Sequence, residues 1–224
     1  MKPIFIIILF VQYLIAQDHW ETAVFSYDQW RYNVPDAELP LNWNTIDFDD
    51  IGWNEGEGGF GYSDDDDGTI IDSAISVYLR KKFDVIDLSK LSSAVISADY
   101  DDGFIAYLNG YEIGRSYNLS EPGTFVAFDQ TTYYDHEASL YSGGLPESII
   151  LDSLMLDSLL TNGENVFAVQ VHNVGLNSSD MSSNFYLTFG ISDDSQFYSS
   201  PPSWFQGPIV FGESNLPLIL IDTY

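Results

Sequence analysis

The sequence contains no cysteine and has only seven lysines and arginines among its 224 residues. Without cysteine the chain forms no disulfide, carries no cysteine-linked lipid and has no thiol nucleophile. The seven basic residues face 34 acidic ones, and the formal charge is −27 at pH 7. Nucleic acids and anionic membranes are bound through clustered Lys and Arg, so this charge balance excludes both as partners. It is compatible with solubility in a salty medium and with cation binding.

Catalytic motifs are also missing. The segment GEGGFG (56–61) matches G-x-G-x-x-G, but an aspartate run follows where a dinucleotide site needs a helix N-terminus. The segment HEASL (136–140) has Leu140 where a zinc protease has its second histidine. No G-x-S-x-G is present, and the presence of two carboxylates says nothing in so acidic a chain. We therefore predict that the chain is not an enzyme.

A long hydrophobic run is found near the N-terminus. Lys2 is followed by IFIIILFVQYLIA, which ends at Ala16. A membrane-spanning helix needs about 20 apolar residues, so this run is typical of a signal peptide over residues 1–16. Leu14 stands where the cleavage signal prefers a small residue, and an uncleaved anchor is the alternative. We expect export, to the medium or the cell surface, without membrane insertion after cleavage.

Helical patterns are scarce, and alternating patterns dominate. In SVYLRKKFDV (76–85) the apolar Val77 and Leu79 alternate with Tyr78 and Arg80. Similar alternation in VFAVQVHNV and FYLTFGI predicts antiparallel strands with one solvent-exposed face. Two apolar runs flank Asn109-Gly110, the preferred pair for a type I′ hairpin turn. These patterns predict an all-β fold, an antiparallel jelly-roll β-sandwich.

The sequence also indicates how the chain is divided. One short helix is expected in LDSLMLDSLLTNG (151–163), ending near Asn162-Gly163. The sandwich is expected to span residues 17–191. The polar, proline-containing stretch 192–213 is typical of a linker. The apolar segment 214–224 then predicts the first strand of a truncated following domain.

The run of Asp64, Asp65, Asp66 and Asp67 is the first candidate metal site. An EF-hand ending its turn at Gly68 would place Ala74 where a bidentate glutamate is required, so this is no EF-hand. Calcium still accepts six to eight oxygens from any loop that gathers carboxylates, and a structural calcium ion is one interpretation. The other is an exposed turn whose charges are solvated one by one. Paired acids at Asp101 and Asp102 would also favour a divalent cation if the loops converge at one end of the sandwich.

Aromatic residues provide a second set of candidates. Sugars are bound by stacking on exposed rings, and Trp53 and Tyr62 lie next to the glycine-rich segment. In a chain this rich in Tyr and Phe, packing in the core is the alternative for any single ring.

Several blocks, in order, resemble a known family. They are DFDDIGWNEGEGGFGYSDDDDGTII, SVYLRKKFDV, ADYDDGFIAYLNGYEIGR, DHEASLYSGGLPESIILD, NGENVFAVQVHN and SSDMSSNFYLTFG. Together, from about Val24 to Ile191, they are similar to the galactose-binding-like β-sandwich module of secreted bacterial multidomain proteins. That module often precedes a CotH-like kinase domain, and SNLPLILIDT resembles the first strand of such a domain.

The resemblance implies a non-catalytic accessory module that commonly binds carbohydrate and can carry structural calcium. The expected partners are a glycan or cell-surface polysaccharide and the downstream domain of the same chain. The matching blocks make these residues candidates for ligand binding, beside Trp53 and Tyr62: Arg80, Asp101, Asp102, His172 and Asn173. Asn109 also matches, but its turn role is preferred. A structural spacer or protein-interaction domain that positions a downstream domain is the alternative function, and it predicts that the aromatic rings are buried.

Overall fold

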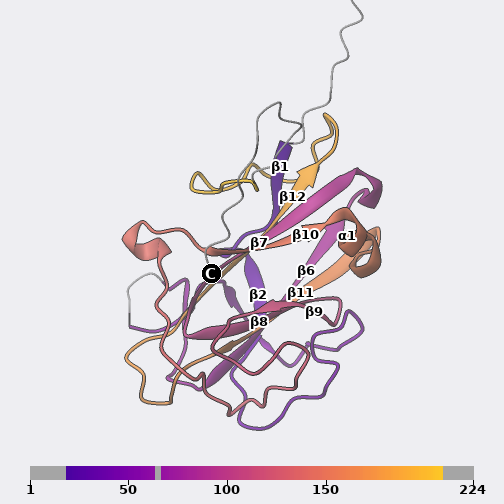
Figure 1. Cartoon of the computed structure of the whole chain (residues 1–224). Coiled ribbons are helices and arrows are strands. Elements are labelled where there is room, and N and C mark those ends of the chain that lie inside the picture. Colours follow the sequence, from indigo (N-terminus) through magenta and orange to yellow (C-terminus); the bar gives the residue numbers. More distant parts are fainter. Residues whose placement is uncertain (1–18, 64–66, 209–224) are drawn as a thin grey trace, which may run out of the picture.

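A computed structural model describes residues 19–63 and 67–208, and they form two antiparallel sheets packed face to face (Figure 1). The four-stranded sheet has the order β1 (His19–Val24), β12 (Ser182–Ile191), β7 (Leu91–Asp101), β10 (Glu147–Asp152). The six-stranded sheet has the order β3 (Asn54–Glu57), β2 (Gln29–Asn33), β6 (Ser76–Val85), β11 (Gly163–His172), β8 (Gly103–Leu108), β9 (Tyr111–Arg115). The short β4 (Phe60–Gly61) and β5 (Thr69–Ile70) pair in parallel. The predicted antiparallel β-sandwich is confirmed.

From β6 to β12 the chain passes back and forth between the two sheets, apart from the β8–β9 hairpin. This alternation brings the inward-facing side chains of both sheets into one core, which includes Leu79, Phe104, Phe167 and Phe189. Burial of such side chains, each contributing roughly 1.5–3 kcal/mol, holds the sheets together without a disulfide. Among the described residues no helix is long and apolar enough to cross a membrane.

The local predictions for the hairpin and the helix are confirmed. Asn109 and Gly110 both have positive φ, 48° and 91°, as a type I′ turn requires. Asn109 also has a structural role, because its Nδ2 donates to Leu159 O and its Oδ1 accepts from Val166 N. The helix α1 (Ser153–Leu159) is shorter than predicted and ends before Asn162-Gly163. The other helical turns in the described part of the chain are 3-10, Leu88–Lys90 and Leu140–Ser142.

The prediction of a solvent-exposed outer face is wrong for the middle of the six-stranded sheet. Tyr78, Arg80 and Gln170 point outward from the core but are buried. The loop between β2 and β3 covers Tyr78 and Arg80, with the Trp43 ring 4.7 Å from that of Tyr78. Gln170 instead donates to Val126 O of the β9–β10 connection. The alternation of a strand indicates the polarity of its own side chains. It does not indicate whether a loop from elsewhere in the chain covers them.

The expected linker is, in its described part, packed against the sandwich. Within residues 192–208, Tyr198 packs on Phe189 and Trp204 packs edge-on against Tyr186 of β12. Thr22 N donates to Ser199 O at 2.8 Å, which adds a bridge beside β1. This yellow segment lies beside β1 and β12 in Figure 1. The expected signal peptide (1–16), the aspartates 64–66 and the expected strand 214–224 lie outside the described residues.

Candidate metal centre and adjoining tyrosine surface

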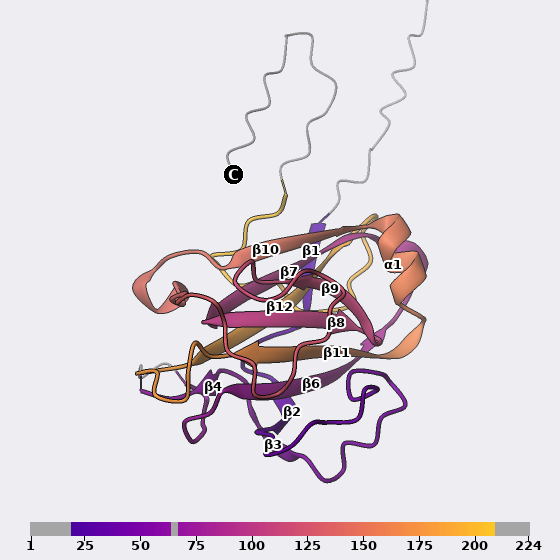
Figure 2. The same ribbon diagram turned by 60° about the horizontal axis from the view of Figure 1, so that its bottom comes forward.

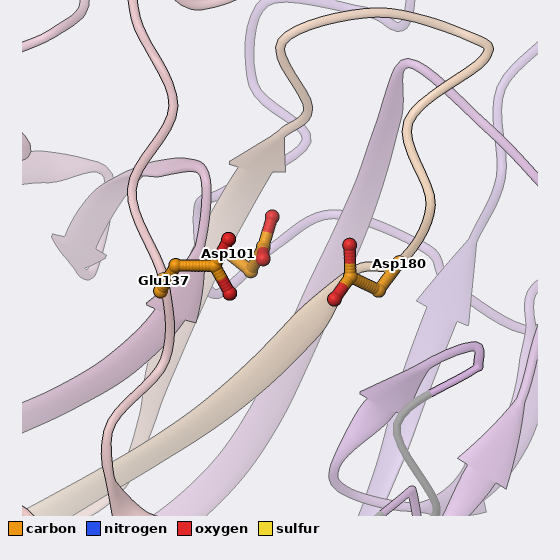
Figure 3. Close-up of side chains that lie close together, drawn as sticks. All are labelled: Asp101, Glu137 and Asp180. Carbon is orange, nitrogen blue, oxygen red and sulfur yellow. The ribbon is translucent and has the colours of Figure 1, made fainter.

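Three carboxylates from distant parts of the chain meet at one end of the sandwich. Asp101 is the last residue of β7, Glu137 lies in the long β9–β10 connection, and Asp180 comes just before β12. One oxygen from each lies within 4.8 Å of the others. In Figure 3 the side chain of Asp101 lies between those of Glu137 and Asp180. We call these three residues the acidic cluster.

Strand pairing places two members of the acidic cluster side by side. β7 and β12 are antiparallel, and Asp101 is paired with Ser182. Asp180, two residues before Ser182, is therefore brought to the end of β7. Asn173 holds this loop in place, because its Nδ2 donates to Asp180 O at 3.0 Å and to Tyr62 Oη at 2.9 Å.

Asp102 fixes the remaining parts of the site. Its Oδ1 accepts from His136 N at 2.7 Å and its Oδ2 from Val174 N at 2.6 Å. The first bond positions the segment that carries Glu137, and the second positions the loop that leads to Asp180. Asp99, two residues before Asp101 on β7, has a similar role, and its Oδ1 accepts from Ser139 N at 2.7 Å. These carboxylates satisfy backbone donors and are structural.

Asp101 differs from Asp102, whose two oxygens both accept backbone N–H groups. It is only 4% exposed, and its Oδ1 has no hydrogen-bond partner among the described residues. Burial, followed by the nearby charges of Asp102, Asp180 and Glu137, raises the pKa of Asp101 to about 8. A buried carboxylate among like charges is stabilised either by a proton or by a cation.

The donor set determines which cation fits. It consists of carboxylate oxygens only, which suits hard cations such as calcium or magnesium better than zinc or copper. Calcium–oxygen distances are about 2.3–2.6 Å, so oxygens on opposite sides of the ion lie about 5 Å apart. The acidic cluster has this spacing and could hold a metal ion.

Three exposed tyrosines adjoin the acidic cluster. Tyr117, Tyr133 and Tyr134 are 70%, 58% and 59% exposed. The rings of Tyr117 and Tyr134 stack at 6.3 Å, and that of Tyr133 is edge-on to Tyr134 at 6.2 Å. Asn118 links them to the site, because its Nδ2 donates to Asp102 O at 3.1 Å and to Tyr134 O at 2.8 Å. We call these three residues the tyrosine surface.

The two rings singled out in the sequence are not at this surface, and both are buried, as the packing alternative predicts. Trp53 is 8% exposed and packs beside Trp43 and Phe48. Tyr62 is 9% exposed and belongs to the main core. Both rings are covered by protein because the β2–β3 loop and the end of the sandwich close over them.

Two further candidates also have structural surroundings. Arg80 is buried on the outer face of the six-stranded sheet, where its Nε donates to Asp50 Oδ2 at 2.8 Å. His172 is fully buried and its Nδ1 contacts Gln130 O at 2.7 Å. Burial lowers the pKa of His172 to about 4, so the ring is neutral at pH 7.

Of the aspartate run, the structure describes only Asp67. Its Oδ1 lies against Gly61, where an added Cβ would be 2.3 Å away. Asp67 is not a member of the acidic cluster, and calcium binding by Asp64, Asp65 and Asp66 stays a prediction. Loop carboxylates were expected to converge at one end of the sandwich, and Asp101 is the predicted residue that takes part in such a cluster. Glu137 and Asp180 were missed because isolated acids in loops carry no local pattern.

The fold and the site together define a β-sandwich with a candidate hard-cation centre. No protein-family model matches the chain, and no curated protein matches it. Among solved structures, a calcium binding mutant of Bacteroides uniformis beta-glucuronidase 2 is similar over 77% of this chain and 18% of that one (14% identity, TM-score 0.45). An uncultured Clostridium sp. beta-glucuronidase is similar over 84% of this chain and 31% of that one (13% identity, TM-score 0.45). A beta-glycosidase from Bacteroides vulgatus is similar over 75% of this chain and 20% of that one (16% identity, TM-score 0.43). The chain thus spans 18% to 31% of the length of these three proteins.

Proposed function

We propose that this chain is a secreted, non-catalytic, galactose-binding-like module that binds a glycan through a calcium ion in the acidic cluster and through the tyrosine surface. The observation that carries the proposal is the buried Asp101 carboxyl, whose Oδ1 has no hydrogen-bond partner among the described residues and which lies between Glu137 and Asp180. A cation there would replace the proton of Asp101 and relieve the repulsion between the three carboxylates.

The exposure of the residues suits the two roles. The acidic cluster supplies three ligands, whereas calcium takes six to eight oxygens, so hydroxyl groups of a sugar or water can complete its coordination. Glu137 is exposed, so one side of the acidic cluster is open to solvent. The exposed faces of Tyr117 and Tyr134 can stack on the apolar face of a sugar ring held at the ion.

A carboxyl group with a raised pKa beside other carboxylates is also found in glycosidases. A glycosidase acid must touch the bond that it protonates. Asp101 is 4% exposed, so its burial favours a metal ligand over a general acid. For this reason a binding module is the better proposal.

The burial of Trp53 and Tyr62 favours a second candidate function. A structural spacer or protein-interaction domain was expected to bury these rings, because it needs no platform for a sugar. Such a module would position a downstream domain, for which a CotH-like domain remains the prediction from the sequence. This candidate does not require a sugar-dependent signal at the tyrosine surface.

Calcium binding is tested first, by titration calorimetry and by thermal melting with and without EDTA. We expect calcium at one hundred times its Kd to stabilise the protein by about 2.7 kcal/mol, by mass action. Asp101→Asn should abolish this gain. Affinity should rise with pH up to about 8, because the ion displaces the proton of Asp101. An unchanged melting midpoint in millimolar calcium would remove the metal from the proposal.

Glycan binding is tested on an array with calcium and again with EDTA. Tyr134→Ala should weaken binding about tenfold or more, as expected for loss of a stacking ring. The matched control is Tyr111→Ala, an equally exposed ring at the β8–β9 turn, at the opposite end of β8 from Asp101. Binding that needs neither calcium nor Tyr134, or no binding to any glycan, would favour the spacer function.

A further inference from the structure

The few basic residues of this acidic chain are concentrated at one place. Lys and Arg number seven in the sequence. Four of them line a single pocket of about 270 Å³ at the β2–β3 side of the six-stranded sheet: Arg31, Arg80, Lys81 and Lys82. β2 and β3 lie at the lower edge of that sheet in Figure 2. The same lining contains two acids, Asp50 and Glu55, and Asp28 and Glu164 pair with Lys81 and Lys82 from outside it.

We propose that this pocket binds an oxyanion, a carboxylate or sulfate group of an acidic saccharide. The proposal goes beyond the calcium-dependent site and does not depend on it. Along β11, the residue paired with Arg80 is Ala168, and His172 lies beside Asp102. These two positions are four residues apart, roughly 14 Å at the usual strand rise, so the pocket is separate from the acidic cluster.

Strand pairing builds the pocket. Arg31 on β2 is directly opposite Arg80 on β6. Like charges opposite each other are unfavourable unless an anion compensates them. Asp50 pairs with Arg80 but not with Arg31. The Nη2 of Arg80 is buried and has no hydrogen-bond partner among the described residues. The Arg80 side chain is 0% exposed, so the groups open to the oxygens of an anion are the guanidinium of Arg31 and the neighbouring Lys82, both at least 36% exposed.

The existing partners of the outer cations are weak enough to be replaced. Arg31 and Glu55 are 3.8 Å apart, and both side chains are at least 36% exposed. Lys82 and Glu164 pair at 3.0 Å but are likewise exposed. Ion pairs of this kind contribute about 0–1 kcal/mol, so an incoming anion can displace the glutamates. The net charge of −27 opposes the approach of anions, and we therefore expect weak, millimolar binding.

The probes are galacturonate, neutral galactose and inorganic sulfate, followed by NMR chemical-shift titration of the full chain. We expect galacturonate or sulfate, but not galactose, to shift signals of β2 and β6. Whichever anion binds more tightly tells whether the pocket prefers a carboxylate or a sulfate group. Binding should weaken as sodium chloride is raised, because the pocket is open to solvent.

Arg31→Gln and Lys82→Gln should each raise the Kd of the anion about tenfold, the effect of losing one charged hydrogen bond. Lys90→Gln is the matched control, since Lys90 pairs with Asp193 outside the pocket. Unchanged melting midpoints would show that the variants are folded. The proposal is overturned if neither anion binds, if galactose binds equally well, or if Lys90→Gln has the same effect. Anion binding that persists in Asp101→Asn would separate this pocket from the calcium site.

Discussion

Arg80 and Asp101 are both buried ionisable side chains, and their surroundings are opposite. Arg80 meets an aspartate, Asp50, and the carbonyl oxygens of Trp43 and Thr45. Asp101 meets Glu137 and Asp180, which have its own charge, and its Oδ1 has no donor among the described residues. Isolated charge is costly to bury, so a buried ion needs partners of opposite sign. The Nε and Nη1 of Arg80 have such partners within the chain, whereas Asp101 requires a proton or a cation.

Asp102 shows that the number of hydrogen-bond donors, and not the position in the chain, distinguishes a compensated buried carboxylate from Asp101. It follows Asp101 directly and is equally buried, but both of its oxygens accept backbone N–H groups. Asp102 therefore has a structural role, whereas Asp101 is a candidate metal ligand. A buried carboxylate indicates function only when no donor compensates it.

The largest effect is expected at Arg80. Arg80→Met keeps an apolar stem but leaves Asp50 and two carbonyl oxygens without their donor. Breaking a buried ion pair in this way costs about 3–5 kcal/mol, which should appear as a lower midpoint in urea unfolding. Lys82→Met, on the same strand, removes an exposed pair and should cost no more than about 1 kcal/mol. Equal losses in the two variants would show that the Arg80 region does not depend on its buried charge.

The buried ring of His172, whose Nε2 has no hydrogen-bond partner among the described residues, predicts acid sensitivity. The pKa of His172 is about 4 in the folded protein and near 6.5 when unfolded, because burial disfavours the charged ring. The unfolded chain thus binds the extra proton first, so this stability is complete above pH 6.5. It is lost as the pH falls toward 4, by about 3 kcal/mol in all.

His172→Gln should flatten the stability curve between pH 6.5 and 4, measured by urea unfolding at a series of pH values. His19→Gln, on β1 and half-buried, should keep the acid loss. If wild type and His172→Gln lose stability in parallel over this range, the buried ring is not the cause.

Much of the fold could be predicted from the sequence because each strand has a local alternating pattern. Alternation located the strands around Leu79 and Phe189, and the φ > 0 requirement located the turn at Asn109-Gly110. The cover over Tyr78 and Arg80 could not be predicted, since it depends on a loop that folds back across the sheet. Nothing in a single strand's pattern records such a contact.

The site was only partly predictable for a similar reason. Asp101 and Asp102 form a visible pair, but Glu137 and Asp180 are single acids whose proximity depends on the pairing of β7 with β12. The tyrosine surface lies in a connection without periodicity, so aromatic content pointed to Trp53 and Tyr62 instead. Both lie near glycines because the chain turns there to close over the core, which is also why they are buried.

The smallest effect is expected at Glu21, another buried acid that sharpens the comparison. Its Oε2 accepts from Phe197 N and Tyr198 N, both at 2.8 Å, as the oxygens of Asp102 accept from backbone donors. Burial acts to raise the pKa of Glu21, but these bonds and His19 lower it overall. Its contribution is therefore complete above the unfolded pKa, near 4.5, and lost as the pH falls through the lower folded value.

Glu21→Gln keeps an acceptor for both N–H groups and removes the charge, so we expect a loss of about 1 kcal/mol at pH 7. The loss should be local, with faster amide hydrogen exchange at Phe197 and Tyr198 and unchanged exchange in β11. Glu164→Gln, an exposed acid at the start of β11, is the control and should leave both regions unchanged. A loss at Glu21 as large as that at Arg80 would mean that satisfied buried charges stabilise this fold regardless of whether their partners are ions or backbone dipoles.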